Sequence, residues 1–322
     1  MSLQCPIFGD QSYLFLADEV TYGVVPGSPS YNFIPVDSYA LKLVPEQRVP
    51  MPFTGLTEEM DKMIIRSSTS GQITFPLQGW HLTPLTTSIA QYLMAWGFAD
   101  LEVVCNLASK LAEWAEGPNV ENKQSTGLVV NGATLTGSED NGGKISLALD
   151  LRGVAENPLV TAQVVPAGFV RANEMIFQDC SFKIGPNSGA LVAVPWKGFT
   201  WQQQRSLTPA FNGLAAPQFY RPGKPVNNFS FNIEKADGTW DAIRRSTTKN
   251  EYYGRLTLKA PHNGTGTVAT NYAQCVINFP KLSFVETQDN YVRSGPLQQT
   301  IQFAIQKPQS LASSTQTWSD VA

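Results

Sequence analysis

Apolar and polar residues alternate along much of the chain, which is the pattern of strands that bury one face. Residues 39–45 (YALKLVP) and 71–77 (GQITFPL) alternate in this way, as do residues 197–203 (KGFTWQQ) and 227–233 (NNFSFNI). The pattern predicts a mainly β protein with short helices. We expect its cores to contain Leu41, Leu43, Ile73, Phe75, Phe199, Trp201, Phe229 and Phe231.

The same features occur twice, in the same order and at nearly constant spacing. FTGL at 53–56 returns as FNGL at 211–214, which is 158 residues later, and KISLALDL at 144–151 matches TIQFAIQK at 300–307, which is 156 residues later. Several matches in order point to an internal repeat, although any one could arise by chance. We therefore predict two tandem domains, 1–158 and 159–307, followed by a polar tail at 308–322.

Other elements complete each predicted unit. We expect helices at 83–98, 108–116 and 239–249, and a hairpin before each late strand, at 127–143 and 274–295. The polar tail is expected to be held by a neighbouring chain, through Trp318, or to dock on its own domain.

Two segments between strands, 45–70 and 203–226, are longer than ordinary loops and rich in apolar residues. Disordered segments lack such residues, so some surface should bury them. Each could fold over its own domain or pack onto a neighbouring subunit. In the second case the contact residues would be Met51, Phe53, Leu56, Met60, Phe211, Leu214, Phe219 and Tyr220.

Charge is low overall and unevenly divided. Charged residues make up 15% of the 322 residues and the net charge is −3, so the chain lacks the basic surface that tight phosphate binding requires. Residues 1–158 hold 8 Lys/Arg and 17 Asp/Glu, whereas residues 159–322 hold 15 and 9. The opposite charges of the halves could serve separate partners or could meet each other.

Candidate catalytic chemistry is sparse. The four cysteines have no CxxC spacing, and the two histidines, His81 and His262, are more often structural or solvated in such settings. The glycine-rich segments GSEDNGG and HNGTGT lack phosphate-loop spacing and suit hairpin turns. We therefore predict no enzyme, no cofactor and no metal. We expect no signal peptide from residues 1–11 (MSLQCPIFGDQ), which lack a basic and apolar leader pattern. The apolar stretch 89–99 is shorter than the ~20 residues that cross a membrane.

Several of these stretches resemble siphophage tail tube proteins. They are residues 17–47, residues 66–77 (RSSTSGQITFPL), residues 177–204, and the short helix TWDAIRRSTT at 239–248. The resemblance implies a β-sandwich or split-barrel unit with a flanking helix, in which one sheet contributes to a ring-shaped barrel around a lumen. Family rings are commonly sixfold, so two copies per chain would give a trimer with about 24 lumen strands. A hexamer of whole chains is the alternative.

If the apolar positions form the cores, the alternate positions face the lumen. The predicted lumen residues are Lys42, Gln72, Thr74, Ser146, Asp150, Thr200, Gln202, Gln204, Asn228, Ser230, Asn232 and Gln302. They are small, polar and nearly uncharged, as a conduit for DNA requires. An ordinary solvent-facing sheet is the alternative interpretation.

The resemblance also implies partners: further copies of the chain within and between rings, a tape-measure protein and other tail proteins, and double-stranded DNA in transit without specific binding. We expect no membrane partner, and we expect assembly in the host cytoplasm into the virion tail. A distal tube or hub protein with the same fold is the main alternative. A carbohydrate-binding or adhesin module is a more distant one.

Overall fold

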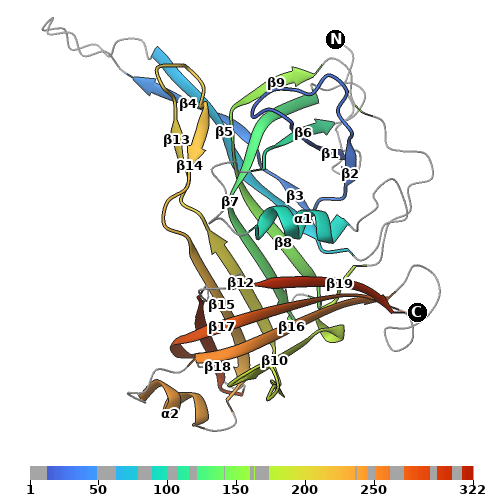
Figure 1. Cartoon of the computed structure of the whole chain (residues 1–322), viewed down its shortest axis with the longest axis vertical. Coiled ribbons are helices and arrows are strands. Elements are labelled where there is room, and N and C mark those ends of the chain that lie inside the picture. Colours follow the sequence, from blue (N-terminus) through green and yellow to red (C-terminus); the bar gives the residue numbers. More distant parts are fainter. Residues whose placement is uncertain are drawn as a thin grey trace, which may run out of the picture.

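A computed structural model describes the greater part of the chain. The described residues are 13–48, 63–78, 89–99, 108–115, 122–140, 142–159, 163, 174–235, 238–245, 251–261, 272–290, 296–306 and 314–321. The fold is mainly β, with two α-helices among these residues (Figure 1). This confirms the predicted fold class.

The first half contains β1 (Tyr13–Asp18), β2 (Asn32–Ile34), β3 (Ser38–Tyr39), β4 (Lys42–Arg48), β5 (Met63–Pro76), α1 (Ile89–Gly97), β6 (Lys110–Ala115), β7 (Asn122–Ser138), β8 (Ile145–Gly153) and β9 (Ala155–Leu159). The second half contains a 3₁₀ turn (Phe177–Asp179), β10 (Ser181–Gly185), β11 (Val192–Ala193), β12 (Gly198–Gln204), β13 (Thr208–Ala210), β14 (Phe219–Arg221), β15 (Val226–Glu234), α2 (Thr239–Arg245), β16 (Glu251–Pro261), β17 (Tyr272–Asn290), β18 (Gln298–Ile305) and β19 (Thr315–Val321).

In the first half, the long strand β7 belongs to two sheets. Its N-terminal part pairs with β6 and β9, and β6 continues through β1 to β2. Its C-terminal part pairs with β8, which continues through β5 to β3 and β4. The pairing register shifts between Val130 and Gly132, so a bulge lies where the strand passes from one sheet to the other. The apolar faces of both sheets contribute to the core, as in a sandwich whose strands switch sheets.

The second half repeats this pairing scheme. Strand β17 pairs with β16 and β19 at its N-terminal part and with β18 at its C-terminal part. Strand β16 continues through β10 to β11, and β18 continues through β15 to β12. Every strand pairing within the described first half therefore has a counterpart in the second.

One further pairing joins the halves. Strands β7 and β12 are antiparallel over seven residue pairs, from Gly198 opposite Ser138 to Gln204 opposite Gly132. We call this pairing the internal seam. It makes one continuous sheet of eight strands in the order β4, β5, β8, β7, β12, β15, β18 and β17. At its end Lys197 of the basic half lies 3.3 Å from Glu139 of the acidic half, so the opposite charges meet here.

The core of the first half includes the predicted helix. Ile89, Leu93, Met94 and Trp96 of α1 are buried. The end of the helix packs so closely on the sheet that a Cβ added at Gly97 would lie 2.9 Å from a methyl group of Leu149. A larger residue at this position would therefore require the Leu149 side chain to move. No helix in the described part of the chain is long and apolar enough to span a membrane.

Three expectations about local structure are wrong. Residues 110–115 form strand β6, not part of a helix, because both of its edges pair with strands. The segments 127–143 and 274–295 are not hairpins in themselves: residues 127–138 lie in the single long strand β7, and residues 274–290 lie in the single long strand β17. The chain reaches the next strand, β8, at Ile145. Much of the two long loops is strand, since β4 extends to Arg48, β5 begins at Met63, and β13 and β14 occupy the second loop.

The core prediction holds except at Leu43, which is 42% exposed. Leu43 lies on the same strand face as the buried Leu41, but it belongs to an edge strand, which pairs only with β5 among the described residues. The tail docks on its own chain, because β19 pairs with β17 and Trp318 packs against the core. His81, His262 and the HNGTGT segment lie outside the described residues.

Candidate assembly surfaces

The predicted lumen residues share one face of the eight-stranded sheet. One row of directly opposed residues runs from Ser146 through Thr136, Thr200 and Ser230 to Gln302. Opposed residues in antiparallel strands point to the same side, so the alternation on each strand is in phase across the internal seam. The structure thus brings together all twelve: Lys42, Gln72, Thr74, Ser146, Asp150, Thr200, Gln202, Gln204, Asn228, Ser230, Asn232 and Gln302. We call this surface the polar face.

The polar face has further members that the sequence analysis missed. Thr134 and Thr136 of β7 lie opposite Ala148 and Ser146, and Glu286 of β17 lies opposite Gln302. They were missed because β7 and β17 were interpreted as hairpins. The alternation of Thr134 and Thr136 with the buried Ala133 and Leu135 was the signal that could have found them.

Charges on the polar face are few, and some of them have polar or charged partners. Asp150 accepts a hydrogen bond of 2.5 Å from the Asn131 amide and lies 3.9 Å from the Arg152 guanidinium. Glu234, at the end of β15, forms an ion pair of 2.8 Å with Lys197. The face therefore presents hydroxyl and amide groups across most of its width.

The hairpin of β13 and β14 projects from the second half and lies beside β4 and β5 of the first half (Figure 1). The Ser67 amide donates to the Ala215 carbonyl over 2.9 Å, and the Arg66 guanidinium lies 4.7 Å from the centre of the Phe211 ring. We call this pair of hairpins the arm. It brings together the two long segments that the sequence analysis singled out.

The predicted arm residues differ in exposure. Leu214 and Phe219 are exposed, by 53% and 40%, whereas Tyr220 is buried. The Tyr220 hydroxyl donates to the Gly153 carbonyl over 2.9 Å, and burial raises the pKa of Tyr220 to about 12. Tyr220 therefore holds the hairpin onto the first half of its own chain. Met51, Phe53, Leu56 and Met60 lie outside the described residues.

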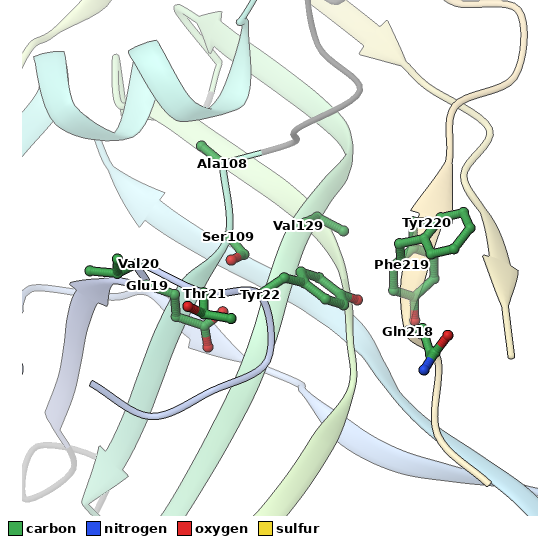
Figure 2. A pocket seen from close by; sticks show the side chains of 10 residues that line it. All are labelled: Glu19, Val20, Thr21, Tyr22, Ala108, Ser109, Val129, Gln218, Phe219 and Tyr220. Carbon is green, nitrogen blue, oxygen red and sulfur yellow. The ribbon is translucent and has the colours of Figure 1, made fainter. Parts of the chain in front are cut away.

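A pocket of about 440 Å³ separates β14 from the loop that follows β1 (Figure 2). It is lined by Glu19, Val20, Thr21, Tyr22, Ala108, Ser109, Val129, Gln218, Phe219 and Tyr220. The Glu19 carboxylate already accepts the amides of Gly23 and Gly127, at 2.9 and 2.8 Å, so it orders the loop. Burial raises the pKa of Tyr22 well above its ordinary value, which keeps the phenol neutral. The lining favours packing at the base of the arm over acid–base chemistry.

Comparison with known proteins is consistent with this architecture. The model of the family described as phage tail tube protein matches residues 9–272. The chain belongs to this family. No curated protein matches the chain.

Membership gives the chain a structural role in the phage tail tube. It places the chain in the virion tail, among proteins that assemble with copies of themselves and with other tail proteins. The resemblance stated from the sequence is thereby confirmed.

Proposed function

We propose that three chains close into a ring with pseudo-sixfold symmetry and that rings stack into a tube through which the genome passes. The observation that carries this proposal is the continuous polar face, to which each half contributes four strands. Three chains would supply about 24 strands, enough for a wide barrel rather than a packed core. The repeated pairing scheme supports an origin by duplication, with domains at 1–158 and 159–307.

Closure follows from the cost of free edges. An open sheet presents unpaired backbone groups that invite uncontrolled association, and a ring removes them. Around such a ring the acidic and basic halves alternate, so every junction can be electrostatically complementary, as at Lys197 and Glu139 within the chain. Head-to-tail stacking of rings is a heterologous contact, which produces a filament.

In this assembly the polar face lines the bore. A surface of hydroxyls and amides makes few ion pairs with phosphate, so a moving duplex would not be held by counterion release. Double-stranded DNA in transit and a tape-measure protein are the proposed contents of the bore, and the arms carry the contacts between rings. Assembly is proposed to take place in the host cytoplasm.

Electron microscopy of the purified chain, with a native mass of the smallest ring, tests this function. Long uniform tubes built from rings of three chains are expected. Six chains per ring would replace the trimer by a hexamer in which only one half lines the bore. Single rings that never stack would favour a distal tube or hub protein, and monomers at all concentrations would favour a binding module.

Charge added to the polar face should slow ejection. Gln202→Arg together with Ser230→Arg places new cations on neighbouring strands of the proposed bore. We expect genome release from variant phage to slow by about tenfold or more in low salt and to recover in high salt, because phosphate contacts are salt-dependent. Gln202→Met with Ser230→Met adds bulk without charge and should leave release unchanged. Normal genome release by the arginine variant at low salt would show that this face does not line the bore.

A charge on the exposed tip of the arm should block stacking. Leu214→Asp alters an apolar side chain that is 53% exposed, so the subunit should fold normally. If the arm packs onto the next ring, a buried carboxylate there would lower tube formation by more than about tenfold. Thr208→Asp, at an exposed position of β13, is the matched control. Sedimentation and electron microscopy measure the outcome, and tubes of normal length from Leu214→Asp would contradict a role for this residue.

A further inference from the structure

We propose that the junction between subunits uses the strand edges equivalent to those of the internal seam, in the same antiparallel orientation: strands β3 and β4 of one chain pair with residues 284–290 of β17 in a second copy, with Lys42 opposite Glu286. This inference rests on the proposed ring and specifies which edges meet and in which register.

Both partners are edges of the same eight-stranded sheet. Among the described strands, β3 and β4 pair only with β5, so their other edge has no strand beside it. At the far end of the sheet, β17 pairs with β18 through Asn290, while β16 on its other side ends opposite Ser283. Within the described chain, residues 284–290 therefore have a strand beside only one of their two edges, and Val285 is a bulge in that pairing. One free edge at each end is what a closing sheet requires.

The internal seam provides the precedent for this pairing. In the repeated scheme, β12 corresponds to β3 and β4, because each precedes and pairs with the next long strand, β15 or β5. Likewise β17 corresponds to β7. Because β12 pairs with β7 inside the chain, the equivalent pairing of β3 and β4 must involve the β17 of another copy. The same antiparallel orientation would continue the polar face without interruption.

Charge selects the register. Continuity of the polar face lets Lys42 lie opposite Glu286, Gln288 or Asn290, which occupy alternate positions of β17. Lys42 and Glu286 are both exposed, and neither has an ion-pair partner within the described part of the chain. Opposite charges on directly opposed residues stabilise a pair of strands, so Lys42 is expected beside Glu286.

Two exposed apolar side chains favour the same register. Leu43 follows Lys42 and Val285 precedes Glu286, and these two apolar side chains are 42% and 54% exposed. Placing Lys42 opposite Glu286 brings Leu43 against Val285 and the adjoining Phe284. Burying both side chains would remove two exposed apolar groups at once.

The β17 edge is also held in a fixed position. Lys235 forms ion pairs with Asp289 at 2.9 Å and with Asp241 of α2 at 2.6 Å. The Gln299 amide donates to Asp289 at 2.9 Å and to Asp241 at 3.1 Å. Rigid edges lose little entropy on pairing, so this network prepares residues 284–290 for a strand partner.

Charge reversal provides the first test. Lys42→Glu alone and Glu286→Lys alone should each raise the concentration needed for ring or tube assembly by about tenfold or more at low salt, with a smaller effect in high salt. The double variant should recover most of the assembly. If wild-type chains form tubes and neither single variant changes that concentration, this junction is wrong while the proposed function stands. If wild-type chains form neither rings nor tubes, both proposals fail.

A cysteine pair provides the second test. Lys42→Cys with Glu286→Cys should form disulfides between chains in assembled tubes and give closed covalent trimers on a non-reducing gel. Thr136→Cys with Thr200→Cys is the matched control, because these residues are opposed across the internal seam and should link within one chain. Tubes in which the control pair links and the Lys42–Glu286 pair does not would overturn the proposed register.

Discussion

Trp201→Ala is expected to destabilise the folded chain by roughly 3–5 kcal/mol, which is the range for deleting a large buried aromatic side chain. Trp201 is fully buried on β12 and lies opposite Leu135 across the internal seam. Its ring stacks on Phe98 of the first half, with 3.7 Å between the ring centres. It meets Phe279 of the second half edge-on, with 5.1 Å between the ring centres. Its removal therefore opens a cavity where both cores meet, so the halves should lose cooperativity as well as stability.

Urea unfolding followed by circular dichroism measures this loss. Trp201→Phe is the informative companion, because it keeps an aromatic ring against Phe98 and removes the hydrogen bond of 2.9 Å from the indole to Asn227. Trp201→Phe should lower the free energy of unfolding by about 1–2 kcal/mol, which is the value of one buried hydrogen bond and a small change in volume. A loss below about 1 kcal/mol for Trp201→Ala would mean that the two cores do not depend on this contact.

The alternation of apolar and polar residues was enough to predict the polar face, because strand pairing carries the same alternation from each strand to the next. A residue such as Thr200 stands opposite Thr136 on one side and Ser230 on the other, so a correct side assignment on one strand extends across the sheet. The helix α1 was predictable for a similar reason, since a mostly apolar stretch of that length suits a buried helix. These features depend on local periodicity.

Strand β6 was not predictable in this way. Its sequence KLAEWA suits a helix by propensity, yet Lys110 and Glu113 are both buried within a sheet. The Lys110 ammonium lies 3.8 Å from the centre of the Tyr92 ring and bonds to Asp18, and Glu113 accepts hydrogen bonds from Tyr31 and Gln124. These partners are distant in sequence, so propensity alone gave the wrong element.

The hairpin predicted at 127–143 was wrong for a related reason. Asn131-Gly132 is the dipeptide of a tight hairpin, but here it forms a bulge within β7. The Asn131 side chain bonds to Asp150 and accepts the Leu207 amide at 2.8 Å, which fixes the bulge against the second half. Only the tertiary fold distinguishes this use of the dipeptide from a turn. The arm and the internal seam depend on contacts of the same long-range kind.

Arg205→Met should also destabilise the chain strongly, by roughly 3–5 kcal/mol, because three carbonyl groups, two of them buried, would lose a charged donor. The Arg205 side chain is 2% exposed, and its guanidinium donates to the carbonyls of Val130, Gly97 and Ala99, each at 3.1 Å. Gly97 ends α1, so the cation also meets the negative end of the helix. Burial lowers the pKa of Arg205 to about 10, which still leaves the group charged at neutral pH.

A lysine cannot replace this arrangement, because one ammonium lacks the planar fork that reaches three separate acceptors. Arg205→Lys should therefore recover less than half of the stability lost by Arg205→Met. Arg221→Met, at an exposed position of β14, should change the free energy of unfolding by no more than about 0.5 kcal/mol. Because Arg205 follows β12 and its acceptors belong to the first half, an unfolding curve in which Arg205→Met matches Arg221→Met would show that the helix end and the internal seam are stable without it.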